Sequence, residues 1–164
     1  MKRLFLLVTL IVLFALNVIS ISASRRQDSP AKPKQSKSDA KIVAAVRAVL
    51  DAQAAAWNRG DIEGFMDGYA RSGETVFVSG DTVTRGWQTV LNRYKRGYNT
   101  REKMGQLDFT DLEITPLGKD AAVALGRWQL TRAEDKPHGR FTLIFRRTPQ
   151  GWRIVHDHTS SASP

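Results

Sequence analysis

The sequence predicts an α+β domain in which the helices come first and the strands follow. Between residues 42 and 98 most apolar residues recur every three or four positions, which is the helical period. From Met104 onward apolar residues alternate every second position, which is the strand period. We therefore expect three N-terminal helices and a short hairpin, then a four-strand meander. The curved antiparallel sheet should wrap around the helices.

Composition indicates one folded domain with an extension. The chain has 164 residues, 41% of them hydrophobic, and four tryptophans, which is enough for a substantial core. It has no cysteine, which excludes disulfides, thiolate nucleophiles and thiolate metal sites. Seven of the 25 basic residues and one of the 16 acidic residues lie in residues 1–37. The remaining 18 basic and 15 acidic residues give the rest of the chain a net charge of only +3. A nucleic-acid-binding domain is therefore not expected, because its basic patch would lie on the folded part.

The N-terminus predicts an export segment. A basic start precedes an apolar run at residues 4–21 and small residues at 22–24, the layout of a signal peptide cleaved after Ser24. The alternative is an uncleaved anchor in which residues 4–21 span the inner membrane. Arg25-Arg26 disfavours both cleavage and simple export. We expect a signal peptide or anchor at 1–24, a disordered basic linker at 25–37, a domain at 38–161, and a periplasmic, secreted or membrane-anchored protein.

Capping residues set the predicted helix ends. Ser38 is a candidate N-cap for a first helix that ends near Arg59, with Gly60 after its end. Asp61 is placed to cap a short second helix whose apolar face reaches Tyr69.

The remaining elements follow from turns and changes of period. Residues 75–78 and 82–84 flank a Ser-Gly-Asp turn, which predicts a hairpin, and a third helix follows at about 87–98. In the first long strand the apolar phase slips at Thr110-Asp111, which predicts a β-bulge. Further strands are expected at 121–132, 139–147 and 151–160.

The last strand carries the candidate site residues. Two histidines flank an aspartate there, and simple alternation places both histidines on one face of the strand and the aspartate on the other. One predicted face holds Trp152, Ile154, His156 and His158; the other holds Arg153, Val155, Asp157 and Thr159. The histidines could both reach a metal ion, but only His138 remains as a further histidine ligand, so we predict no metal site.

Asp157 has three possible roles. In an apolar cavity its pKa would rise, and it could act as a general base with Tyr69, Tyr94 or Trp57 as a hydrogen-bond donor. It could instead contact a bound ligand. It could also be structural, paired with an arginine such as Arg127 or Arg140.

Three motifs resemble one family: Trp57-Asn58-Arg59-Gly60-Asp61, Arg85-Gly86, and the closing segment from Gly151 to Ser160. The chain resembles the SnoaL-like branch of the nuclear transport factor 2 superfamily over about residues 39–161, especially its small bacterial proteins of unknown function. It is also similar to the association domain of calcium/calmodulin-dependent kinase II. The resemblance implies a cone-shaped, cystatin-like fold with one pocket, usually dimeric through the sheet.

The resemblance also implies pocket residues. Pocket arginines of the association domain bind carboxylates; one of them corresponds to Thr159 here, and others fall near Trp128 and Thr142, close to Arg127 and Arg140. Because the Thr159 face is the pocket face there, Asp157 should point inward and the histidines outward. The expected ligand-binding residues are Trp57, Tyr69, Tyr94, Trp128, Arg127, Arg140, Asp157 and Thr159.

Two functions remain open at this point. The first is a ligand-binding or oligomerisation module, exported or tethered. The second is a small isomerase, dehydratase or cyclase-like enzyme with Asp157 as general base. No nucleophile elbow, phosphate loop or dinucleotide-binding glycine pattern is present, and no cofactor is expected. The expected partners are a second copy of the chain and a small organic molecule.

Overall fold

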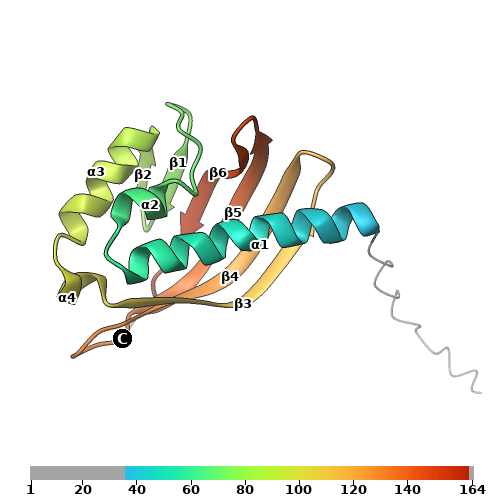
Figure 1. Cartoon of the computed structure of the whole chain (residues 1–164). Helices are drawn as coiled ribbons and strands as arrows, with labels where there is room; N and C mark the ends of the chain where they lie inside the picture. The colour runs from blue at the N-terminus through green and yellow to red at the C-terminus, as the bar shows by residue number, and fades with distance from the viewer. Residues whose placement is uncertain (1–35, 163–164) are drawn as a thin grey trace, which may run out of the picture. The chain divides into compact units, whose positions relative to one another are not determined.

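The computed structural model describes residues 36–162, which form four helices and one six-stranded sheet (Figure 1). The predictions for residues 1–35 lie outside the described residues. In chain order the elements are α1 Lys37–Asn58, α2 Ile62–Met66, β1 Val76–Ser79, β2 Thr82–Arg85, α3 Trp87–Gly97, α4 Arg101–Met104, β3 Gln106–Pro116, β4 Ala121–Thr131, β5 His138–Thr148 and β6 Gly151–Thr159.

The sheet has the strand order β2-β1-β6-β5-β4-β3 and curves around α1 (Figure 1). Strands β3 to β6 form the predicted antiparallel meander. The sheet is mixed rather than wholly antiparallel, because β1 pairs in parallel with β6. Local turns determine the direction of hairpin neighbours only, so the sequence does not reveal how a strand pairs with one about 80 residues away. The α+β class with helices before the meander is confirmed.

The N-terminus of α1 begins two residues earlier than predicted. Ser36, not Ser38, is the N-cap: its hydroxyl accepts from the Asp39 amide at 3.1 Å, and its own amide donates to the Asp39 carboxylate at 3.3 Å. This capping box satisfies two backbone donors at once, which explains the choice of serine. At the other end Gly60 has φ +86°, as expected of a residue just past a helix. Asp61 caps α2 through the Gly64 amide at 2.7 Å.

A short helix that the sequence did not reveal, α4, fastens the end of α1. The Arg101 guanidinium donates to the carbonyls of Trp57 and Asn58, each at 3.0 Å. The Asn58 side chain in turn donates to the Leu107 carbonyl at 3.0 Å and accepts from its amide at 2.7 Å. The last turn of α1 is thereby joined to α4 and to the start of β3.

Two bulges bend the meander, and one was predicted. The register of β3 shifts between Thr110 and Glu113, with Asp111 in the left-handed region at φ 52°, which confirms the phase slip. The second bulge lies at Val155 in β6 and was missed. Residues 154 and 156 pair with consecutive residues of β5, so Val155 has no partner there.

The second bulge makes the predicted alternation of β6 wrong in its first half. Trp152 and Ile154 are buried on the same side as Asp157, whereas both histidines lie on the other side of the strand. The extra residue at Val155 changes the phase between the two halves. Asp157 points inward, as the resemblance implied.

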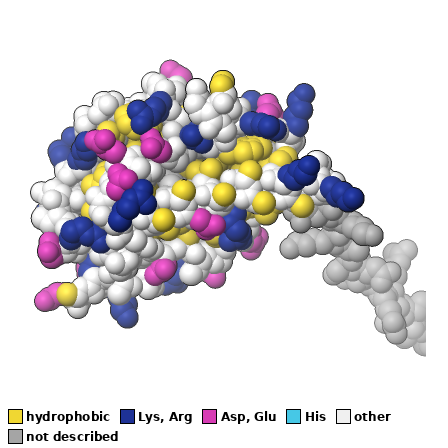
Figure 2. Space-filling view, viewed as in Figure 1, with side chains coloured by type: hydrophobic (Ala, Val, Ile, Leu, Met, Phe, Trp, Pro, Cys, Tyr) yellow, Lys and Arg dark blue, Asp and Glu magenta, His cyan; other side chains and the backbone are white. Residues whose placement is uncertain are grey.

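The core lies between α1 and the concave face of the sheet, where Val46 and Leu50 of α1 meet Leu143 and Phe145 of β5 in one apolar cluster. On the face seen in Figure 2, small apolar side chains of α1 are exposed among scattered basic and acidic side chains. Within residues 36–162 no helix is long and apolar enough to cross a membrane.

Candidate functional site

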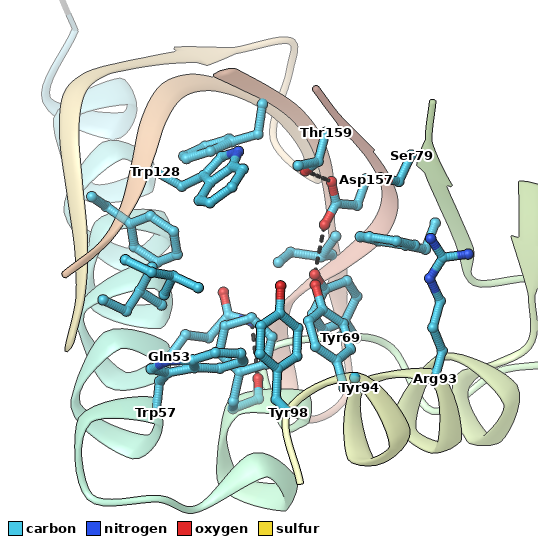
Figure 3. A pocket seen from close by; sticks show the side chains of 18 of the residues that line it. Gln53, Trp57, Tyr69, Ser79, Arg93, Tyr94, Tyr98, Trp128, Asp157 and Thr159 are labelled. Atoms are coloured by element: carbon cyan, nitrogen blue, oxygen red, sulfur yellow. Dashed lines mark hydrogen bonds between the residues drawn. The ribbon is translucent and has the colours of Figure 1, made fainter. Parts of the chain in front are cut away.

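A cavity of about 410 Å³ opens between the three helices α1 to α3 and the concave face of the sheet (Figure 3). Its walls are mainly aromatic and aliphatic. The aromatic lining consists of Trp57, Phe65, Tyr69, Phe77, Tyr94, Tyr98, Phe109, Trp128 and Phe141.

The aromatic rings support one another, so this wall is stiff. Trp57 lies edge-on to Tyr98 and Phe65, with ring centroids 4.7 and 5.1 Å apart, and Phe65 lies edge-on to Tyr94 at 5.2 Å. The indole N–H of Trp57 donates to the Met104 carbonyl at 3.1 Å. Trp57 therefore contributes ring surface to the cavity, and its donor is already used.

Asp157 is buried in this apolar surrounding and is 3% exposed. One carboxylate oxygen accepts from the Tyr69 hydroxyl at 2.6 Å, and the other accepts from the Thr159 hydroxyl at 2.6 Å (Figure 3). Pairing with an arginine such as Arg127 or Arg140, which was one of the three roles considered, is therefore not observed. Arg140 forms an exposed ion pair with Asp111 at 2.9 Å. The partners of Asp157 are neutral hydroxyls.

Burial raises the pKa of Asp157 to about 6. The hydrogen bonds from Thr159 and Tyr69 and the nearby imidazole of His158 oppose this effect and keep the pKa from rising further. The carboxylate is thus mostly ionised at neutral pH, and it takes up a proton at mildly acidic pH.

The neighbouring phenols stay protonated. Burial, followed by the negative charge of Asp157, raises the pKa of both Tyr69 and Tyr94 well above the usual value for tyrosine. Tyr69 uses its proton on Asp157, whereas the Tyr98 hydroxyl points into the cavity (Figure 3). The site therefore offers one buried carboxylate beside hydroxyl donors.

Six of the eight expected ligand-binding residues line the cavity: Trp57, Tyr69, Tyr94, Trp128, Asp157 and Thr159. Arg127 and Arg140, which occupy opposite positions in the register of β4 and β5, are not among the lining residues. The resemblance placed them only near the pocket positions, and strand alternation turns them to the outer face.

Sequence reasoning missed two arginines, Arg93 and Arg132, at the cavity. Arg132 lies two and four positions after Leu130 and Trp128, which also line it, so alternation along β4 would have found it. Arg93 had no such signal, because it precedes Tyr94 on the edge of the apolar stripe of α3. Among residues 36–162 no three His, Asp or Glu side chains gather as a metal-binding group.

The SnoaL-like domain family matches residues 46–164 of the chain. A solved nuclear transport factor 2-like protein of unknown function from Shewanella oneidensis MR-1 is 37% identical; the match covers 73% of this chain and 98% of that one, with a TM-score of 0.70.

Two more distant structures share the fold. A nuclear transport factor 2-like superfamily protein from Salmonella enterica is 21% identical, with 76% and 94% of the two chains covered and a TM-score of 0.61. A ketosteroid isomerase-like protein from Erwinia carotovora atroseptica is 19% identical, with 76% and 98% covered and a TM-score of 0.60. No curated protein matches the chain. The family match and the 37% identical structure establish that this chain belongs to the SnoaL-like family of the nuclear transport factor 2-like superfamily.

Proposed function

We propose that the domain binds a small, largely apolar organic molecule in its cavity. The observation that carries this proposal is a cavity of about 410 Å³ with nine aromatic side chains in its lining. Small-molecule sites commonly measure about 300–1,000 Å³ and combine apolar walls with a few polar groups. Because the rings brace one another, little ordering is needed when a ligand enters.

Asp157 would orient the ligand. An ionised carboxylate has about four acceptor positions, and Tyr69 and Thr159 occupy one on each oxygen. The free positions can accept an O–H or N–H of the ligand. This role matches the second of the three roles open to Asp157.

A melting-temperature screen tests cavity binding. Neutral, acidic and basic aromatic compounds are added to the full chain, and a ligand at about 100 times its Kd should stabilise the fold by about 2.7 kcal/mol. Ser161 is exposed and lines the cavity, so Ser161→Trp should obstruct it and abolish the shift. Ser38→Trp, on the exposed N-terminal turn of α1, is the matched control. Binding that survives Ser161→Trp unchanged would place the ligand elsewhere.

A second candidate is a proton-transfer enzyme, and the pKa of Asp157 favours it. A buried base with a pKa of about 6 is suited to removing a proton from a carbon beside a carbonyl near neutral pH. A phenol such as Tyr98 could then donate to the carbonyl oxygen as negative charge develops there.

The Asp157→Asn variant separates the two functions. The amide keeps the shape of the side chain and cannot accept the proton. For a ketone found in the screen, exchange of its α-hydrogens with deuterated water is followed by NMR. Exchange by the wild type that is lost in Asp157→Asn, with binding retained, supports the enzyme and excludes a pure binding module.

We also propose a second copy of this chain as a partner. The outer sheet face exposes two large apolar side chains, Leu125 at 40% and Ile144 at 37%, on the adjacent strands β4 and β5. Val123 pairs directly with Ile144 and extends this patch. Export through residues 1–24 is a further proposal, which mass spectrometry of the mature N-terminus tests.

A further inference from the structure

Arg132 directly follows the last residue of β4 and lines the cavity. Its Nε is buried and has no hydrogen-bond partner among residues 36–162. The guanidinium reaches one acid, Asp135, at 3.6 Å through a different nitrogen. This buried Nε is out of reach of a ligand, but the contact with Asp135 is too long for a hydrogen bond, so the terminal nitrogens of this cavity-lining cation can still donate.

Gly105, which follows α4, leaves room for the stem of Arg132. A Cβ at Gly105 would lie 2.8 Å from the Arg132 Cγ and 2.6 Å from the Thr131 carbonyl oxygen. The glycine, at φ +62°, thus allows the arginine stem to lie across the backbone. The Arg132 side chain is only 26% exposed, so its cation is positioned rather than free in solvent.

A second arginine, Arg93 of α3, lines the same cavity (Figure 3). It is fixed by a hydrogen bond to the Thr84 hydroxyl at 3.2 Å and lies 5.1 Å from the ring centroid of Phe77. Burial raises the pKa of Tyr98, while the positive charges of Arg132 and Arg93 both act to lower it. The fields of the two cations therefore converge on the Tyr98 hydroxyl, which is itself a donor.

The polar groups of the cavity are unequally satisfied. Asp157 is the one acid among the described lining residues, and both of its oxygens already accept hydrogen bonds. Both arginines and Tyr98 are donors, and the terminal nitrogens of Arg132 have only a long contact with Asp135. The group that the cavity lacks is thus an acceptor with negative charge.

We propose that Arg132, Arg93 and Tyr98 form a subsite for a carboxylate, so that the preferred ligand is an aromatic or otherwise apolar acid with its body between the aromatic walls. This inference rests on the proposed binding function and specifies its ligand class. The planar guanidinium matches a carboxylate with two parallel hydrogen bonds. The acid end would lie at the arginines, and the opposite end of the ligand would approach Asp157.

Two probes of nearly the same shape test the subsite. Titration calorimetry on the full chain compares 2-naphthoate with 2-naphthamide, which keeps the rings and loses the charge. We expect the wild type to bind the acid about tenfold more tightly, the effect of one charge-assisted hydrogen bond. Arg132→Gln should remove most of this preference and weaken binding of the acid far more than binding of the uncharged amide. Arg132→Lys should restore part of it.

The control is Arg140→Gln, which makes the same charge change at an exposed position outside the cavity and should preserve both affinities. Equal binding of acid and amide by the wild type, or an unchanged preference in Arg132→Gln, overturns the carboxylate subsite and leaves cavity binding intact. Failure of the wild type to bind 2-naphthoate overturns it as well. The proposal of cavity binding is overturned only if Ser161→Trp leaves the melting-temperature shift of every ligand in the screen unchanged.

Discussion

At the scale of single residues, the burial of Asp157 works against the stability of the fold. Its pKa rises from 3.8 to about 6 in the folded state, so the folded chain holds this proton more tightly than the unfolded chain does. Stability from this group is therefore greatest below the unfolded pKa and falls as pH rises through about 6. A shift of about two units corresponds to roughly 3 kcal/mol of destabilisation at neutral pH.

The Asp157→Asn variant should accordingly be more stable than the wild type at pH 7.5, by about 1–3 kcal/mol. The amide is neutral, and the Tyr69 or Thr159 hydroxyl can rotate to accept from it. At pH 4.5 the difference should shrink, because the wild-type carboxyl is then largely protonated in the folded state. Urea unfolding at both pH values measures this. A variant clearly less stable at pH 7.5 would show that Asp157 is a structural acceptor.

The residues of the site were predictable in part. The closing motif resembles a pocket strand, which correctly placed Asp157 and Thr159 inside. The prediction that Arg127 and Arg140 line the pocket was wrong, because nearness in sequence to a pocket position does not determine the direction of a side chain. An offset of one residue places a side chain on the opposite face of a strand. Of the hydroxyl partners of Asp157, Thr159 lies two residues away on the same strand face, where alternation places it. Tyr69 lies 88 residues away, and no local pattern distinguishes it from the other candidate donors, Tyr94 and Trp57.

At the scale of elements, the bulge in β3 requires an unusual backbone at Asp111. Its φ of 52° is costly for most residues and worst for β-branched ones. Asp111→Val should therefore lower the free energy of unfolding by about 1–2 kcal/mol, although valine favours strands elsewhere.

Asp111→Gly is the matched control. Glycine adopts this conformation freely, and the lost ion pair with Arg140 is exposed, so the net change should stay within about 1 kcal/mol. Urea unfolding of the two variants measures the difference. Equal stability of the valine and glycine variants would contradict the expected backbone strain.

The joint between α1 and β3 depends on Asn58. Asn58→Ala would leave both backbone groups of Leu107 without their side-chain partner, at a cost of about 2–3 kcal/mol. Asn92→Ala, on the exposed side of α3, should cost less than about 0.5 kcal/mol. Similar losses in both variants would show that the joint contributes little.

Elements with strong local signals were the predictable ones. Gly60 and Asp61 marked the boundary of the first two helices, and the phase slip marked the β3 bulge. Helix α4 has four residues, too few to show a period, although Thr100 caps it. The β6 bulge escaped because the residues on either side of Val155 each read as a normal strand.

At the scale of the whole domain, the outer sheet face determines whether two copies associate. Ile144→Lys places a charge at the centre of the proposed contact and should convert a dimer into a monomer, as measured by sedimentation velocity. Leu117→Lys, at a 61% exposed position outside the strands, should have no effect. A wild-type chain that sediments as a monomer at every concentration would refute this partner.

The arrangement of the whole sheet was only half predictable. Short turns dictate the order β3-β4-β5-β6, because consecutive strands with tight connections become neighbours. The place of the β1–β2 hairpin beside β6 depends on contacts between residues far apart, such as Phe77 opposite Asp157. Strand β1 contributes Phe77 and Ser79 to the cavity wall, so the full lining could not be read from local patterns.

The bulge in β6 also determines where the chain can change its length. Val155 is a surplus residue, since the strands beside it provide no position for it. A chain lacking Val155 would still turn Trp152, Ile154, Asp157 and Thr159 inward by plain alternation, with a straighter strand. Loss of Arg153 instead would leave the bulge at Val155 in place and turn Trp152 to the face opposite Ile154 and Asp157. Natural insertions and deletions in this strand are therefore expected at the Val155 bulge, where one residue can be gained or lost without changing which side chains face the cavity.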